Sequence, residues 1–447
     1  MHRTLCFRLS VLIGLLAILF GSLKAQPETR PNIILIFVDD LGYGDVGCYG
    51  SKLTPTPHID KLAAAGVRCT DGYASAATCA PSRLGLMAGR YQQRMGAYSN
   101  TTAPQAIIPK DHLFLPQMLK KAGYRTAHIG KWHINRPAKS VFDDVFNELK
   151  GAADYFPGPE GQFPGHLGSP MVHGWSSKKN MPYLTDLHGD AAVKFIKEQS
   201  EQPQPFFLYL AFNAPHAPWQ APLELKNKFK HISPEVMQLY AAMVHSLDQN
   251  VGKVLRQLEK SGVADNTMVL FISDNGPEWG RNYPAFNWPE SWPSTIVGSA
   301  GPLSGRKAEF LEGGIRVPFI IRWPGKIEAN RVYTRPVNTL DLYETFRVAA
   351  NAPETKSDGT DLLPFLTGRK KEDPHKILFW QGGESRPVYA RMGDWKIVAP
   401  LDHTPPTLFD LRKDIGEKTD IASQHPGIVK EMLGLVEKWK QEIKQVN

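Results

Sequence analysis

The chain has 447 residues, which is enough for two or three domains and a large buried core. Its 42% hydrophobic and 21% charged residues are the proportions of an ordinary soluble globular protein. The formal net charge is +8, or 8 − 3 = +5 without the three basic residues within 1–25. This mildly basic balance favours an acidic substrate, but the basic residues are too dispersed for a nucleic-acid partner.

Residues 1–25 have the organisation of a secretory signal peptide. Arg3 and Arg8 precede an apolar run from Val11 to Phe20, and Leu23-Lys24-Ala25 forms a cleavage site. The run is too short to span a bilayer, and no later segment reaches the ~18 apolar residues of a membrane helix. No cysteine follows it that could carry a lipid. We therefore expect a secreted or periplasmic mature protein with no membrane anchor.

Strand-length apolar runs alternate with helical patterns from residue 26 to about residue 350. The continuous runs, which are typical of strands buried on both faces, are 33–38, 125–129, 206–212, 268–272 and 317–323. Between them, helix signals occur at 56–66, at 113–121 and after Ser233-Pro234. This alternation predicts an α/β domain over residues 26–350.

After about residue 350 the pattern changes to short strands separated by turn residues. These strands are expected at 377–380, 388–391 and 395–398. The tail ends in an amphipathic helix whose apolar face includes Ile428 and Ile443. We expect residues 351–447 to form a smaller α+β subdomain with a small antiparallel sheet and a terminal helix.

Cys79 lies in the most informative stretch of the chain, Cys79-Ala80-Pro81-Ser82-Arg83. Pro81 fits the first turn of a helix, because its missing N–H costs no hydrogen bond there. Cys79 is then at a helix N-terminus, where free N–H groups and the helix dipole favour an anion. The alternative is a buried cysteine that only packs. Cys48 and Cys69 can be paired or free, and no C-x-x-C spacing indicates zinc.

Pairs of oxygen-bearing side chains follow two of the buried strands. Asp39-Asp40 comes after the run at 33–38, and Asp274-Asn275 comes after the run at 268–272. If the sheet is parallel, both pairs lie at the edge where α/β proteins bind ligands. Adjacent carboxylates repel unless a cation intervenes, and these donors suit Ca²⁺ or Mg²⁺. Either pair alone can equally be an acidic turn.

Basic and ionisable side chains follow two further strands or lie in nearby motifs. Lys131 and His133 follow the run at 125–129, and His216 follows the run at 206–212. Arg83 lies in the Cys79 motif, and Lys307 lies ahead of Glu312-Gly313-Gly314. The arginine and the lysines would supply positive charge for an oxyanion. A lone loop lysine is usually solvated and a lone histidine is usually structural, so their motif contexts decide the interpretation.

Motifs spread over almost the whole mature chain follow one family pattern. They are Asp39-Asp40-Leu41-Gly42-Tyr43-Gly44-Asp45, Cys79-Ala80-Pro81-Ser82-Arg83 with Gly89-Arg90, Gly130-Lys131-Trp132-His133, Ala214-Pro215-His216-Ala217-Pro218, Ser273-Asp274-Asn275-Gly276, and Lys307 with Glu312-Gly313-Gly314. Together they resemble the type I, formylglycine-dependent sulfatases of the alkaline-phosphatase-like superfamily. The resemblance implies a large mixed, mostly parallel sheet sandwiched by helices.

The resemblance also implies a role for each site residue. A maturation enzyme oxidises Cys79 to formylglycine, whose hydrated aldehyde is the nucleophile and a ligand of Ca²⁺. The other implied ligands of Ca²⁺ are Asp39, Asp40, Asp274 and Asn275. The remaining implied roles are a clamp on the hydrate for Arg83, sulfate binding for Lys131 and Lys307, leaving-group acid and substrate contact for His216, and base for His133.

We expect the substrate to be a sulfated polysaccharide or an oligosaccharide derived from one, because of the signal segment, the positive charge and the tryptophans that follow Asp274-Asn275. The loop 276–304 carries Trp279, Trp288 and Trp292, which can either rim the pocket or pack within the loop. If they rim the pocket, we expect Trp288 to bind a sugar ring. Two alternatives remain open. One is a phosphodiesterase or phosphonate hydrolase on the same scaffold, and the other is a non-catalytic binder of sulfated glycans whose Cys79 is never oxidised.

Overall fold

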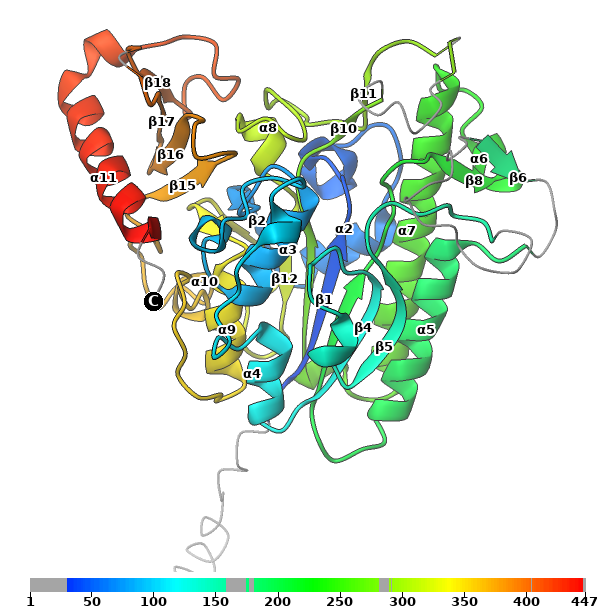
Figure 1. Ribbon diagram of the computed structural model, residues 1–447. Helices are drawn as coiled ribbons and strands as arrows, with labels where there is room; N and C mark the ends of the chain where they lie inside the picture. Colours follow the sequence, from blue (N-terminus) through cyan, green and yellow to red (C-terminus); the bar gives the residue numbers. More distant parts are fainter. Residues whose placement is uncertain are drawn as a thin grey trace, which may run out of the picture. The chain divides into compact units, whose positions relative to one another are not determined.

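The computed structural model is built around an eight-stranded sheet. Its strands are β1 (Asn32–Val38), β2 (Val67–Cys69), β4 (Arg125–Lys131), β5 (Asp144–Leu149), β7 (Phe206–Ala211), β9 (Thr267–Ser273), β12 (Phe319–Arg322) and β13 (Arg331–Tyr333). Their order is β13-β2-β12-β9-β1-β7-β4-β5. Figure 1 labels β1, β2, β4, β5 and β12 of this sheet. β12 runs antiparallel to both neighbours, and the other neighbouring pairs are parallel. The expected mixed, mostly parallel sheet is confirmed.

The structure describes residues 30–157, 174–176, 181–280, 289–290, 292–402 and 404–444. The expected signal segment at 1–25 lies outside these ranges. Residues Pro31–Asn447 form one compact unit. Among the residues described, no helix is long and apolar enough to cross a membrane.

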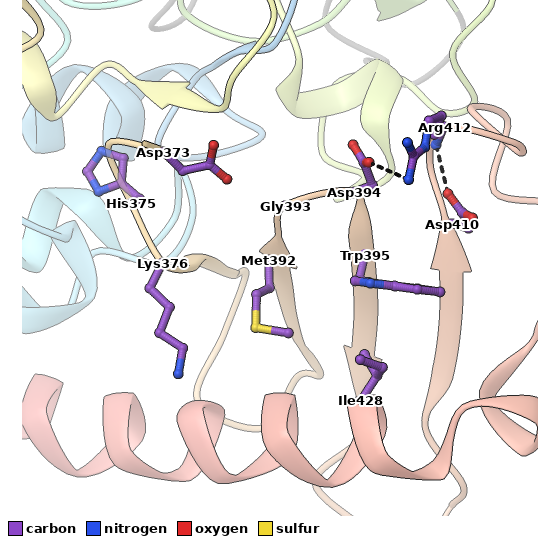
Figure 2. Close-up of a pocket in the computed structure, with 10 residues that line it drawn as sticks. All are labelled: Asp373, His375, Lys376, Met392, Gly393, Asp394, Trp395, Asp410, Arg412 and Ile428. Carbon is purple, nitrogen blue, oxygen red and sulfur yellow. Dashed lines mark hydrogen bonds and ion pairs between the residues drawn. The ribbon is translucent and has the colours of Figure 1, made fainter. Parts of the chain in front are cut away.

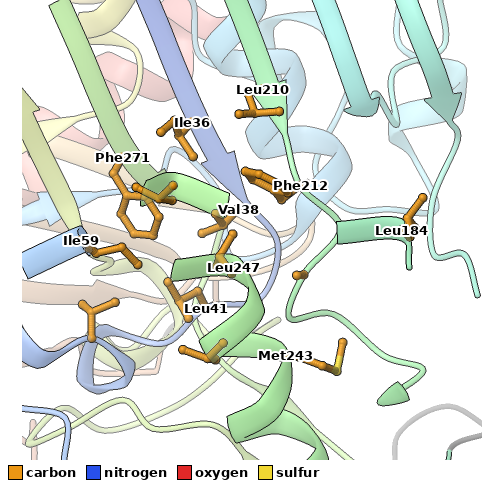
Figure 3. Packing of buried hydrophobic residues seen from close by; sticks show 14 of the residues in the cluster. Ile36, Val38, Leu41, Ile59, Leu184, Leu210, Phe212, Met243, Leu247 and Phe271 are labelled. Carbon is orange, nitrogen blue, oxygen red and sulfur yellow. The ribbon is translucent and has the colours of Figure 1, made fainter. Parts of the chain in front are cut away.

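Strand β1 shows why the sheet needs helices on both faces. All of its residues are buried, and successive side chains point to opposite faces. Even-numbered residues from Ile34 to Val38 join the hydrophobic cluster shown in Figure 3, and odd-numbered residues from Ile33 to Phe37 join a second cluster. The first cluster includes α2 (Pro57–Ala64), α5 (Leu184–Gln199) and α7 (Glu235–Lys260), and the second includes α3 (Cys79–Ala88), α4 (Leu115–Lys121), α9 (Asp341–Ala349) and α10 (Leu363–Leu366).

The C-terminal region forms the expected antiparallel sheet. It contains β15 (Leu378–Gln381), β16 (Val388–Met392), β17 (Trp395–Ala399) and β18 (Thr407–Asp410), in that order, with α11 (Pro426–Lys444). Met432, Val436 and Trp439 of α11 share a core with residues of this sheet. The terminal helix therefore supplies one side of a separate small core.

A buried ionic network joins this sheet to the larger one. Lys396 of β17 is fully buried, and its Nζ lies 2.9 Å from Glu312 Oε1 and 2.8 Å from Glu417 Oε1. Glu312 begins α8 (Glu312–Ile315), and its N–H donates to Glu417 Oε2 at 2.6 Å. Arg316, Arg391 and Asp71 complete the network. Because α8 directly follows the loop that contains Lys307, the ion pair between Glu312 of α8 and Lys396 of β17 connects that loop to the C-terminal sheet.

The remaining described strands form three small pairs. They are β3 (Gly72–Tyr73) with β14 (Val337–Asn338), β6 (Gly174–Ser176) with β8 (Gln220–Pro222), and β10 (Glu278–Trp279) with β11 (Ile296–Val297); α6 (Leu223–Lys228) follows β8. The strands expected in the main sheet agree with the structure to within two residues at each end. Cys48 and Cys69 are free thiols.

Candidate active site

Two neighbouring parallel strands deliver the acidic residues to one place. β1 and β9 pair in register up to Val38 and Ser273, so Asp39 and Asp274 follow adjacent strand ends. The Asp40 N–H donates to Asp274 Oδ1 at 3.2 Å, and Asn275 Nδ2 donates to Asp40 Oδ1 at 2.7 Å. Asp40 adopts a left-handed backbone with φ of 61°, a conformation that is uncommon outside glycine and gathers at functional sites.

The donor atoms at this strand edge fit a cation. Asp39, Asp40, Cys79 and His216 each place one potential ligand atom within 4.8 Å of the others. The Oδ1 atoms of Asp39 and Asn275 are buried and accept no hydrogen bond from the described part of the chain. Buried polar atoms normally have a partner, and these oxygens are of the kind that Ca²⁺ prefers.

Three buried cations surround the carboxylates. Lys131, the last residue of β4, places Nζ 2.5 Å from Asp39 Oδ2. Arg83 of α3 donates from Nε to Asp274 Oδ2 at 2.9 Å, and its Nη2 lies 2.7 Å from the same oxygen. Lys307 Nζ lies 2.8 Å from Asp40 Oδ2. Lysine and arginine are almost never fully buried unless paired, so these ion pairs explain their burial.

The charge balance of this cluster favours a divalent cation. The buried groups are the carboxylates of Asp39, Asp40, Asp274 and Glu278 and the cations Arg83, Lys131 and Lys307. With all of them ionised, one negative charge is in excess. Burial, and next the charge of Asp39, raises the pKa of Asp274 to about 6. A bound divalent cation would change the net charge of these groups from −1 to +1, which would balance the single negative charge of a sulfate ester.

Cys79 is the first residue of α3, as the position of Pro81 predicts. The Ala80 N–H at this helix end donates to Asn100 Oδ1 at 3.0 Å. Burial raises the pKa of the Cys79 thiol to about 12, although Lys131 and Lys307 lower it. The unmodified side chain is therefore a thiol at neutral pH, and a thiol is a poor nucleophile.

The two histidines differ in how they face the cluster. His216 lies with Nε2 3.4 Å from Asp40 Oδ2 and 3.2 Å from Lys307 Nζ, and its Nδ1 is 2.5 Å from the Ala217 carbonyl. Nδ1 is thus assigned the proton, and the Nε2 lone pair points into the cluster. His133 follows β4 in a left-handed conformation. Burial lowers the pKa of both imidazoles well below the usual value.

The tryptophans of the loop after Asn275 do not form one surface. Trp288 lies outside the described residues, so its expected role stays a prediction. Trp292 is buried in a core cluster. Trp279 is half-buried, with the Arg306 guanidinium 4.0 Å from its ring centroid. Of the two described rings, only Trp279 is exposed enough to contact a ligand.

One buried residue of the cluster was missed by the motif analysis. Glu278 is 3% exposed, and its Oε2 lies 2.8 Å from Lys307 Nζ. It stands three positions after Asn275, just beyond the Ser-Asp-Asn-Gly motif. A carboxylate so close to a candidate metal ligand was the one local signal that could have identified it.

A cavity of about 500 Å³ lies in another part of the protein. Figure 2 shows Met392, Trp395 and Ile428 lining it between the C-terminal sheet and α11. It shares no residue with the cluster around Cys79. Its carboxylates are engaged by neighbouring cations, as in the 3.2 Å pair of Arg412 with Asp394, so it does not extend the site.

Comparison with known proteins gives a consistent family. The sulfatase family model matches residues 31–352. Human arylsulfatase A is 31% identical over 94% of this chain and 88% of its own, and N-acetylgalactosamine-6-sulfatase of Rattus norvegicus is 33% identical over 81% and 70%. The crystal structure of Ps i-CgsB in complex with k-i-k-neocarrahexaose is 32% identical, covers 94% of each chain and gives a TM-score of 0.80. The chain therefore belongs to the sulfatase family, whose members hydrolyse sulfate esters.

Proposed function

We propose that this protein removes sulfate from a sulfated carbohydrate, using a formylglycine derived from Cys79 and a bound Ca²⁺. The observation that carries the proposal is the convergence of ligand atoms from Asp39, Asp40, Cys79 and His216 within 4.8 Å of one another. Buried cations surround the same point. Such a site can hold a metal, a nucleophile and a sulfate group together.

Asp39, Asp40, Asp274 and Asn275 are the residues that would hold Ca²⁺ with residue 79. Support comes from the two unsatisfied oxygens, Asp39 Oδ1 and Asn275 Oδ1. When bound, Ca²⁺ supplies Lewis-acid polarisation of a sulfate oxygen. Formylglycine at position 79 supplies a hydrated aldehyde as the nucleophile, in place of a thiol whose pKa is raised by burial. Arg83 is held by Asp274 and orients this hydrate.

Four further residues have roles in binding sulfate and moving protons. Lys131 and Lys307 bind sulfate oxygens, and because they are already fixed by ion pairs they need little reorganisation. His216 presents Nε2 toward the cluster. Because its own proton is on Nδ1, the imidazole first takes up a proton from water on Nε2 and then gives that proton to the departing sugar oxygen. His133 acts in the other half of the reaction and accepts a proton from residue 79.

The substrate class rests on the relatives and on the charge of the chain. Ps i-CgsB, at 32% identity, was crystallised with a carbohydrate, k-i-k-neocarrahexaose. The net positive charge favours a polyanion. The signal segment at 1–25 would send the protein out of the cytoplasm, as a secreted or periplasmic enzyme, and a maturation enzyme acting on Cys79 is its implied partner. Trp288 remains the candidate sugar contact.

The experiment begins with the tryptic peptide from Cys69 to Arg83 of the active protein. Conversion of Cys79 makes this peptide about 18 Da lighter, the mass of H₂S less one oxygen. Cys69 of the same peptide is the internal control, because it should stay a thiol and take up one alkyl group. Full activity with two alkylatable thiols would refute the nucleophile.

The same preparation then distinguishes the two alternatives. Aryl sulfate, phosphodiester and phosphonate esters are compared at equal concentration, and a preference for a phosphorus ester would favour the hydrolase alternative. Defined sulfated oligosaccharides are then tested for sulfate release. Binding of these oligosaccharides with an unmodified Cys79 and no turnover would favour the non-catalytic binder.

A further inference from the structure

Glu278 is a buried carboxylate whose partner is an active-site lysine. It begins the short strand β10, and only 3% of its surface is exposed. Its Oε1 accepts the Trp279 N–H at 2.8 Å, and its Oε2 lies 2.8 Å from Lys307 Nζ. A buried carboxylate is costly unless it is paired and hydrogen-bonded. Oε1 of Glu278 is hydrogen-bonded by the Trp279 N–H, and Oε2 forms an ion pair with Lys307, which is the partner that compensates the buried charge.

Lys307 distributes its ammonium group among three neighbours. Nζ is hydrogen-bonded to Asp40 Oδ2 at 2.8 Å and to His216 Nε2 at 3.2 Å, and it forms an ion pair with Glu278 Oε2 at 2.8 Å. Asp40 belongs to the oxygen set proposed for Ca²⁺, and His216 to the groups proposed to contact substrate. Glu278 is proposed neither to bind Ca²⁺ nor to contact substrate. Its ion pair with Lys307 can therefore persist when Asp40 binds the metal and His216 contacts substrate.

The backbone around this pair fixes it in place. The Lys307 N–H donates to the Pro277 carbonyl at 2.9 Å. Arg306 precedes Lys307 and Trp279 follows Glu278, and the Arg306 guanidinium lies 4.0 Å from the centroid of the Trp279 ring. The segments thus form a buried ionic pair and, next to it, a half-buried stacked pair. This register leaves Lys307 little freedom to point elsewhere.

On the basis of the proposed function, we propose that Glu278 is a positioning residue that holds Lys307 Nζ at the sulfate-binding point of the site. It touches neither the sulfate nor the metal ligands in this role. Removing its charge should therefore weaken sulfate binding and turnover only through Lys307. A residue that merely supported the fold would act independently of Lys307.

The test compares full-length variants on para-nitrophenyl sulfate. Glu278→Gln keeps the shape and removes the charge, and we expect kcat/KM to fall about 10- to 100-fold, as for other groups that orient a site residue. Glu278→Asp keeps the charge and should recover part of this loss. Glu309→Gln is the matched control, because Glu309 pairs with Arg306 at 3.0 Å on the outer side of the same loop. A loss with Glu309→Gln equal to that with Glu278→Gln would overturn the proposal.

A double-mutant cycle with Lys307→Met separates positioning from folding. In that background Glu278→Gln should cause no further loss, and a full independent loss would overturn the proposal. If Glu278→Gln does not fold, Glu278→Asp takes its place in the cycle, with the same criterion.

Binding of inorganic sulfate, measured by calorimetry, is a readout that does not depend on turnover. Weaker binding in Glu278→Gln, with no change in Glu309→Gln, supports the proposal, and unchanged binding in Glu278→Gln overturns it. A wild-type protein that hydrolyses no sulfate ester refutes the proposed function. The sulfate affinities still decide the role of Glu278 in that case.

Discussion

Replacing Lys396 by methionine should destabilise the protein by about 3–5 kcal/mol, the usual cost of breaking a buried ion pair. Methionine keeps most of the length of the side chain and removes its charge. The perturbation falls on the network that joins the C-terminal sheet to α8. Lys396 contacts Glu312 at 2.9 Å and Glu417 at 2.8 Å, and all three side chains are at least nine-tenths buried.

The structure indicates which carboxylate would be left uncompensated. Glu312 keeps Arg316 at 3.2 Å and Arg391 at 3.7 Å. Glu417 has Lys396 as its ion-pair partner, so the loss falls mainly on Glu417. Burial already raises the pKa of Glu417, while Lys396 lowers it. Without Lys396, the pKa of Glu417 in the folded state should rise further.

This shift gives the stability deficit a definite dependence on pH. A carboxyl with a raised folded-state pKa costs nothing while it is protonated in both states. Its cost appears as the pH rises above the unfolded pKa of about 4.3 and grows until the pH passes the folded pKa. The deficit of Lys396→Met should therefore be smaller at about pH 5 than at about pH 8.

Thermal unfolding measures this deficit. A unit of roughly 420 residues has an unfolding entropy of about 0.9 kcal/mol/K, so a deficit of about 4 kcal/mol lowers Tm by about 4–5 °C. Lys413→Met is the matched control, because Lys413 is 82% exposed in its 3.5 Å pair with Asp410. Adding Glu417→Gln to Lys396→Met should restore stability at the higher pH. An unchanged Tm, or the same deficit at both pH values, would refute the reasoning.

Three further outcomes are expected at the site. Chelation should abolish sulfate release and added Ca²⁺ should restore it, whereas full activity of chelated protein would rule out the metal. Calcium affinity, measured by calorimetry, should weaken below about pH 6, because Asp274 then takes up a proton; a constant affinity would place Asp274 outside the ligand set. His216→Ala should reduce hydrolysis of sugar sulfates far more than that of aryl sulfates, since only poor leaving groups need a proton, and equal losses would remove His216 from the acid role.

Much of the main sheet could be predicted because its central strands are continuous apolar runs. β1, β7 and β9 are fully buried, and no polar residue interrupts their pattern. The edge strand β13 and its neighbour β2 have three residues each and carry a charged or exposed position, so they gave no such signal. Residues that follow a buried strand could be placed at one edge from topology alone.

The partners within the site could not be predicted, because they depend on contacts between distant segments. The role of Glu278 depends on its ion pair with Lys307, and the role of Lys396 depends on its ion pairs with Glu312 and Glu417. No periodicity links such positions. Trp292 illustrates the same limit, because the sequence cannot decide whether a loop tryptophan rims a pocket or packs, and the structure places Trp292 in the core.

The ionic network also constrains recombination between members of the family. The family match ends at residue 352, yet Glu312 within it is neutralised in part by Lys396 beyond it. Trp380, also beyond the match, donates from Nε1 to the Ala74 carbonyl at 2.8 Å, a few residues from Cys79. A chimera joined near residue 350 would separate these pairs. Exchange of the C-terminal region should therefore succeed only when the donor supplies a lysine and a glutamate equivalent to Lys396 and Glu417.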